Sequence, residues 1–215
     1  EISLGLVGSE MCIRDRYEGN FLPSPKKTFN PMMIVAIVIL VPGTQFAANF
    51  IANLTGYIRP DWLQQYNELF ETSGITDTTF VTVLYSVILA PICEELIFRG
   101  VTMRCARKAL PFALANLMQA ALFGLFHLNW IQGIYAFALG IVLGYVCERG
   151  GSIYYSMGLH LLFNLWGTLS GFFPDPGNSV VVFVVVIVVT IVSLVAGFVL
   201  FNKGRRKLPI NSTGI

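Results

Sequence analysis

Charged residues are scarce in this sequence: only 12% of its 215 residues are Asp, Glu, Lys or Arg, whereas 55% are apolar. A water-soluble domain of this length has too little interior to hide so much apolar surface. The composition therefore indicates an integral membrane protein. The net charge of +2 is also too small to suggest a nucleic-acid-binding protein.

Cysteine patterns that would indicate a scaffold or a metal site are missing. The four cysteines form no C-x-x-C pair, and their spacing is not typical of a disulfide framework or a thiolate zinc site; they are Cys12, Cys93, Cys105 and Cys147. The sequence also lacks the H-E-x-x-H motif of one class of zinc proteases. It shows no internal repeat.

Residues 1–27 differ from the rest of the chain, because they are mixed, polar and without any period. They do not have the layout of a signal peptide. The chain begins with Glu1 and its first methionine is Met11, a start that a fragment boundary or an assembly error would produce. We therefore treat residues 1–27, and 1–16 in particular, as a tail that is not necessarily native and lies outside the folded unit.

Long charge-free stretches follow from Thr28 onward, separated by short polar or basic clusters. A helix needs about 20 apolar residues to cross the hydrocarbon core of a bilayer. We therefore predict an all-α, multi-pass transmembrane bundle over residues 28–208, followed by a C-terminal tail, 209–215. About six spans are expected, at 31–55, 78–103, 111–128, 131–147, 152–173 and 178–202.

Three further segments have simpler interpretations. Residues 57–77 mix aromatic and acidic side chains, which predicts a short amphipathic helix at the membrane interface. The small residues Gly140 and Gly144 favour close helix packing in the fourth span. The sixth span is rich in Val and Ile, which is typical of a peripheral helix that faces lipid.

Basic residues are unevenly distributed between the two sides of the predicted bundle. With six spans, Arg59 is the only basic residue on one side, where it stands among five acidic residues. Because loops rich in Lys and Arg stay in the cytoplasm, the opposite side and both chain termini are expected there. The basic residues on that side are Lys26, Lys27, Arg104, Arg107, Lys108, Arg149, Lys203, Arg205, Arg206 and Lys207.

The predicted spans contain two carboxylates, one guanidinium and both histidines of the chain. Glu94, Glu95 and Arg99 lie in the second span, His127 ends the third, and His160 lies in the fifth. A charged group at the bilayer centre costs about 3 kcal/mol on insertion scales, so such residues mark a functional site by default.

The spacing of these residues predicts how they are arranged. Glu94 and His127 each stand about 16 residues from the turn at Leu110–Pro111, or about 24 Å along a helix, so they are expected at the same depth. Glu95 and Arg99 have the i, i+4 spacing of a helical ion pair, with the acid first. Glu94 points about 100° away from Glu95 and has no partner on its own helix, which suits a general base that shares a water with His127.

Three motifs carry a resemblance to a known family. Glu94-Glu95-x-x-x-Arg99, Phe123-x-x-x-His127 and His160-x-x-x-Asn164 resemble the signature motifs of the CAAX prenyl protease 2 family. This is the CPBP intramembrane protease group, which includes lysostaphin-resistance-like and bacteriocin-immunity-associated proteins. The motifs occur in the family's order on three hydrophobic spans and cover roughly residues 78–170.

The resemblance implies an intramembrane endopeptidase that acts on a peptide or protein substrate at the membrane, prenylated or not. It implies that Glu94 and His127 activate a water, while His160 and Asn164 hold the developing oxyanion. Supporting roles follow for Glu95 and Arg99 as an ion pair that orders the second helix, and for Phe123 as packing that shapes the pocket.

A zinc-dependent mechanism stays open as an alternative, because the family was long described as metal-dependent. Glu94, His127, His160 and Asn164 could ligate zinc and leave a position open for water. We favour the metal-free form, in which no cofactor is required, because asparagine is a poor zinc ligand and a good oxyanion donor.

Each site residue also has a purely structural explanation. Glu94 could make a hydrogen bond to a neighbouring helix, and His127, His160 or Asn164 could each bridge two helices. Two other functions are compatible with buried acids and histidines: a proton-coupled transporter, and a non-catalytic membrane scaffold or immunity protein. The transporter is less favoured, because the sequence shows no inverted repeat.

Overall fold

The computed structural model describes residues 29–72, 79–170 and 179–205, and all secondary structure in these ranges is helical. The predicted all-α fold is therefore confirmed. The predicted tails 1–27 and 209–215 lie outside the described residues.

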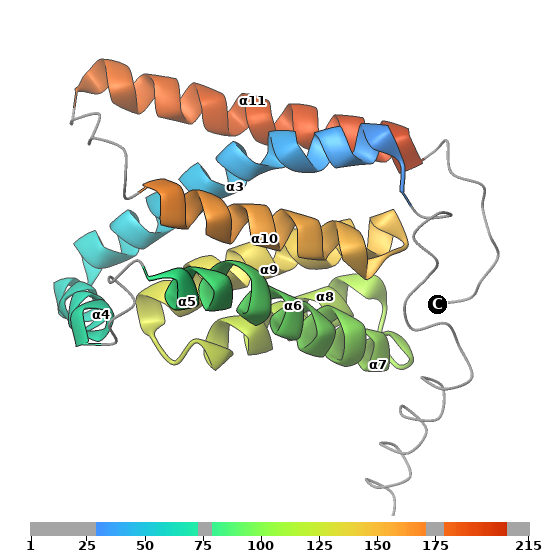
Figure 1. Ribbon diagram of the computed structural model, residues 1–215, viewed down its shortest axis with the longest axis horizontal. Helices are drawn as coiled ribbons and strands as arrows, with labels where there is room; N and C mark the ends of the chain where they lie inside the picture. Colours follow the sequence, from blue (N-terminus) through green and yellow to red (C-terminus); the bar gives the residue numbers. More distant parts are fainter. Residues whose placement is uncertain (1–28, 73–78, 171–178, 206–215) are drawn as a thin grey trace, which may run out of the picture.

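Seven continuous helices make up the described chain (Figure 1). Every predicted span and the predicted amphipathic segment corresponds to one of them, with ends that differ by a few residues. The helices are α3 (Pro31–Ile58), α4 (Pro60–Thr72), the run α5 (Phe80–Val83), η1 (Leu84–Leu89), α6 (Ala90–Glu95), η2 (Leu96–Met103) and α7 (Arg104–Arg107), then α8 (Phe112–Phe126), α9 (Trp130–Gly150), α10 (Ile153–Ser170) and α11 (Val180–Arg205).

Four of these helices are long and apolar enough to cross a membrane: α3, the run from Phe80 to Arg107, α9 and α11. Six helices correspond to the six expected spans, but only four of them meet this criterion. Helix α8 is apolar but has 15 residues, about 22 Å, which is less than the hydrocarbon thickness of about 30 Å. Helix α10 has 18 residues, and polar side chains such as His160 and Asn164 lower its hydropathy.

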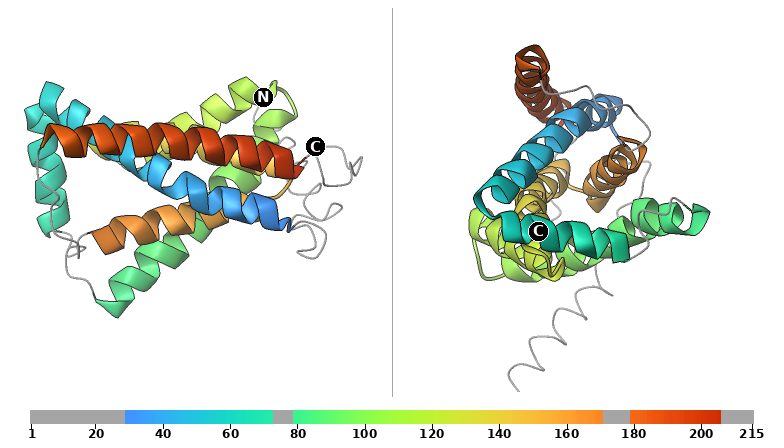
Figure 2. Two further views of the ribbon diagram at one scale, coloured as in Figure 1. Left: turned by 90° about the horizontal axis from the view of Figure 1, so that it is seen from above. Right: turned by 90° about the vertical axis from the view of Figure 1, so that its left-hand side faces the viewer.

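The helices stack in layers that place the motifs in the interior. Helix α11 packs on α3 at one side of the bundle, α9 and α10 lie in the middle, and the helical run Phe80–Arg107 with α8 forms the far side (Figures 1 and 2). A core of apolar side chains fills the space between α3, α9, α10 and α11. Most of the α11 side chains are exposed in the described structure, as expected for a helix that faces lipid.

Helix α11 is hydrogen-bonded to α3 beside Pro42, where α3 lacks one backbone N–H. A proline inside a helix disturbs the backbone around it. The next N–H, that of Gly43, donates to Ser193 Oγ on α11 at 2.9 Å, and the Ser193 hydroxyl donates to the carbonyl of Ile39. One serine hydroxyl thus bridges the N–H of Gly43 and the carbonyl of Ile39, which lie one helical turn apart beside the proline.

Helix α4 covers one end of the bundle. Its Trp62 ring stacks on Trp130 at the start of α9, with 5.4 Å between ring centroids. Its outer face is exposed and polar, and includes the ion pair of Asp61 with Arg59 at 2.6 Å. Aromatic rings on one face and charges on the other are typical of a helix at a membrane interface.

Candidate active site

A buried cluster of charged groups lies where α10 crosses the helix that carries the two glutamates. Glu95 is fully buried, and its Oε1 accepts hydrogen bonds from Arg99 Nη1 at 2.8 Å and from His160 Nδ1 at 3.0 Å. Arg99 is fully buried as well. The structure therefore contains the ion pair that the i, i+4 spacing predicts, and it adds His160 as a partner from another helix.

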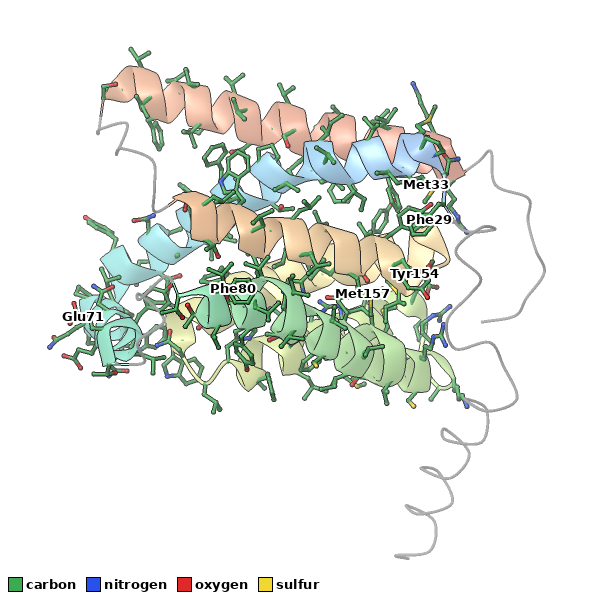
Figure 3. The ribbon with its side chains drawn as sticks, viewed as in Figure 1. Phe29, Met33, Glu71, Phe80, Tyr154 and Met157 are labelled. Carbon is green, nitrogen blue, oxygen red and sulfur yellow. The ribbon has the colours of Figure 1, made fainter. Side chains whose placement is uncertain are left out.

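Glu94 is the more accessible of the two glutamates, with 17% of its side chain exposed. Its Oε2 lies 3.6 Å from His160 Nε2, which is ion-pair distance. The imidazole of His160 therefore stands between the two acids, with one ring nitrogen toward each. Figure 3 helps to locate this crossing: Phe80 begins the helix of the two glutamates, and Met157 lies one turn before His160 on α10.

This arrangement gives Glu94 and His160 a proton to share. Because His160 Nδ1 faces the carboxylate of Glu95, which only accepts hydrogen bonds when ionised, Nδ1 carries a hydrogen. A second proton then lies either on His160 Nε2, facing ionised Glu94, or on Glu94, facing neutral His160. The cluster with Arg99 is electrically neutral in both cases, so the proton can move without leaving an uncompensated buried charge.

Phe123 connects the other candidate residues. The Arg99 guanidinium lies over its ring at 4.5 Å from the centroid, and the rings of His127 and His160 meet it edge to face at 4.9 and 5.6 Å. The Phe123 carbonyl accepts a hydrogen bond from His127 Nδ1 at 2.8 Å. A neutral His127 therefore carries its hydrogen on Nδ1, and its Nε2 is free to accept one.

His127 reaches the site from the last turn of α8, whose C-cap it forms. It lies close enough to Glu94 for an electrostatic interaction, although no direct hydrogen bond joins the two in the described structure. The expected common depth is supported by the contact of Phe98 with Phe123, at 5.1 Å between centroids, since each of these stands twelve residues from the turn.

Asn164, on α10, donates a hydrogen bond to the backbone of η1 in the helix that carries the two glutamates. Its Nδ2 donates to the carbonyl of Ser86 at 2.8 Å. In the π-helical segment η1, each N–H bonds five residues back, as Ala90 does to Tyr85. The next residue is Pro91, which has no N–H, so the Ser86 carbonyl lacks its helical partner and is taken by Asn164.

Residues 76–166 match the family model described as type II CAAX prenyl endopeptidase Rce1-like. This region, which is less than half of the chain, is similar to the Rce1-like family. The matched range contains all three motifs, and the family supports a peptidase that acts on a protein or peptide in the membrane. No curated protein and no solved structure gives a significant match to the chain.

The Rce1-like region contains site features that sequence reasoning missed. The carbonyl of Gly140 accepts from Arg99 Nη2 at 3.3 Å, and the carbonyl of Ser86 accepts from Asn164. Backbone acceptors carry no sequence signal of their own. Pro91 could have indicated the Ser86 carbonyl, because a proline inside a predicted span leaves a carbonyl about one turn earlier without its N–H partner.

The donor set of the Rce1-like site does not fit a metal ion in the described structure. No group of three or more His, Cys, Asp or Glu side chains is arranged to hold one among the described residues. Both nitrogens of His160 face carboxylates, and His127 Nδ1 is bonded to a carbonyl. We therefore derive no step through zinc.

Replacing Pro91 by alanine tests the role of the freed carbonyl. The new N–H can bond to Ser86, which competes with Asn164 for the same acceptor. We expect peptide cleavage to fall about tenfold, because a small displacement of a site residue has an effect of this order, while thermal stability is unchanged or higher. Alanine at Pro42, which lies in α3 away from the site, is the matched control; equal activity losses in the two variants would contradict this role.

Proposed function

We propose that this protein is an intramembrane endopeptidase that hydrolyses a peptide bond of a membrane-associated substrate, with Glu94 as the general base. The observation that supports this most directly is the Glu94–His160–Glu95–Arg99 chain of contacts, in which a partly buried carboxylate is held beside a fully buried ion pair. Such a carboxylate can take a proton from water without access to bulk solvent.

In the proposed first step, a water between Glu94 and His127 attacks the peptide carbonyl. A bond forms between the water oxygen and the carbonyl carbon, the water proton passes to Glu94, and the carbonyl electron pair becomes an oxyanion. His127 orients this water through Nε2, since its Nδ1 is fixed on the Phe123 carbonyl.

His160 and Asn164 are proposed to stabilise the oxyanion. Glu95 accepts from Nδ1 of His160, so Nε2 is the ring nitrogen that faces Glu94 and the site, and in the imidazolium form its N–H donates to the oxyanion. Asn164 has one N–H on Ser86 and a second one to offer. When the intermediate collapses, the C–N bond breaks and Glu94 returns its proton to the leaving amine.

The basic ends of the helices are proposed to lie in the cytoplasm, together with both termini. Arg107 pairs with Glu148 at 3.2 Å, and Asn30 Nδ2 donates to the Gly204 carbonyl at 3.0 Å. The Asn30 N–H also donates to the Tyr155 hydroxyl at 2.9 Å, and Tyr155 lies at the start of α10, just after the end of α9. Together these contacts bring the ends of α7, α9 and α11 and the start of α3 to the same side of the bundle, and the Lys and Arg residues of these helix ends gather there. A cysteine introduced at Lys203 should react with an impermeant thiol reagent from the cytoplasmic side only.

The test of the proposed activity is a cleavage assay with a membrane-tethered peptide library in proteoliposomes. The wild type is expected to cleave, and Glu94→Ala and His127→Ala are each expected to lose about 100-fold or more of the activity. An inactive wild type, or full activity in both variants, would refute the proposal. A chelator series in the same assay separates the two mechanisms: the metal-free form predicts unchanged activity in metal-depleted protein.

A further inference from the structure

Two buried amide side chains on α8 lie outside the three motifs. Asn116 is 6% exposed and Gln119 is fully buried. Gln119 Nε2 donates to Asn116 Oδ1 at 2.7 Å and to the carbonyl of Gly140 on α9 at 2.9 Å, while Asn116 Nδ2 donates to the carbonyl of Ile141 at 3.1 Å. The two amides therefore fasten α8 to two consecutive carbonyls of α9.

Glycines on α9 make room for these amides. A Cβ atom at Gly144 would overlap Asn116 Oδ1 and lie 2.7 Å from Gln119 Nε2. A Cβ atom at Gly140 would lie 3.1 Å from the Cα of Ala120. The Gly140-x-x-x-Gly144 motif thus gives the close packing that was predicted for it, and it also leaves space for polar bonds between the helices.

The Gly140 carbonyl also links this amide pair to the catalytic cluster, by which we mean Glu94, Glu95, Arg99 and His160. It accepts from Gln119 and from Arg99 Nη2, the latter at 3.3 Å. Arg99 is held by three groups: the Glu95 carboxylate on its own helix, the Phe123 ring on α8 and the Gly140 carbonyl on α9. The position of its guanidinium therefore depends on how α8 and α9 are fastened together, which is what Gln119 and Asn116 do at this level.

We infer that Gln119, assisted by Asn116, is a positioning residue of the peptidase: it holds α8 against α9 so that Arg99 keeps Glu95 aligned on His160. This inference rests on the proposed function and extends it to two residues outside the motifs. A polar side chain inside a predicted span is costly unless it is bonded, and here two of the three amide donor bonds reach carbonyls of α9, while the third joins the two amides to each other.

The experiment compares Gln119→Met with Gln45→Met in the cleavage assay. Methionine keeps the length of glutamine and removes its hydrogen bonds. Gln45 is the matched control, because it is 7% exposed, lies in the span α3, and has no hydrogen bond to the catalytic cluster in the described structure. We expect Gln119→Met to lower kcat about tenfold with KM within about twofold, and Gln45→Met to leave kcat within about twofold.

A double-variant cycle with Arg99→Lys separates positioning from general loss of structure. If Gln119 acts through Arg99, the two substitutions together lower kcat by less than the product of their separate effects. Unchanged kcat in Gln119→Met, equal losses in Gln45→Met, or fully multiplicative effects would overturn the inference. If Gln119→Met does not fold, Asn116→Ala, which removes the acceptor that fixes the Gln119 amide, takes its place under the same criteria.

The outcomes also distinguish this inference from the proposed function. A wild type without peptidase activity would refute the proposed function itself. An active wild type that requires Glu94, together with a fully active Gln119→Met, would leave the proposed function intact and refute only the positioning role.

Discussion

Replacing Glu94 by glutamine is expected to lower kcat by about 1,000-fold, in the range by which a general base accelerates such reactions. Glutamine keeps the shape of the side chain and can still contact His160, but it cannot take a proton from water. Because the Glu94 side chain is partly exposed and makes no short hydrogen bond to another described residue, the free energy of unfolding should change by less than about 1 kcal/mol. The two measurements are initial cleavage rates and unfolding in detergent.

Glu94→Asp is the matched control for this prediction, since it keeps the acid and shortens it by one methylene. It should retain measurable activity, with a loss well below that of the glutamine variant. If Glu94→Gln were as active as Glu94→Asp, the carboxylate would not be the base, and the proposed mechanism would be wrong.

Replacing Arg99 by methionine is expected to have the largest effect on stability, a loss of about 3–5 kcal/mol in the free energy of unfolding. Both members of the Arg99–Glu95 pair are fully buried, so the substitution leaves an acid in the interior with the His160 ring as its remaining side-chain partner in this cluster. Reversible unfolding in mixed micelles measures the effect, and a low yield of folded protein should accompany it.

Combining Arg99→Met with Glu95→Gln should restore part of this loss, because the double variant no longer buries an unpaired charge. Arg107→Met is the control, since Arg107 pairs with Glu148 in a partly exposed position and should cost about 1 kcal/mol or less. An Arg99→Met protein as stable as the wild type would show that this pair does not hold the helices in place.

Local patterns in the sequence predicted the helices and the ion pair well. Charge-free runs of about 20 residues have few alternative structures in a chain this apolar, which explains why all seven helical segments were placed within a few residues. The Glu95–Arg99 pair was predictable because its partners share one helix. The count of spans was less accurate, since α8 and α10 are held by neighbouring helices and need less length or hydropathy than an isolated span.

Contacts between helices were predicted less completely. The level of Glu94 relative to His127 followed from a single hairpin, whereas the placement of His160 between both glutamates depends on the packing of α10, which no local pattern determines. Asn116 and Gln119 are amides, so a criterion based on ionisable groups within the spans does not find them. The same argument from the cost of buried polar groups applies to amides, and their i, i+3 spacing on one span was visible.

The hydroxyl of Ser193 has a consequence for the order of assembly in the bilayer. During synthesis α3 is made long before α11, and until α11 arrives the Gly43 N–H and the Ile39 carbonyl can bond only to each other, directly beside Pro42, which has no N–H to offer. When α11 packs on α3, the Ser193 hydroxyl adds a hydrogen bond to each of these two backbone groups. The last span therefore fixes the first at its proline, so a chain that stops before α11 lacks the bridge that fastens this turn of α3.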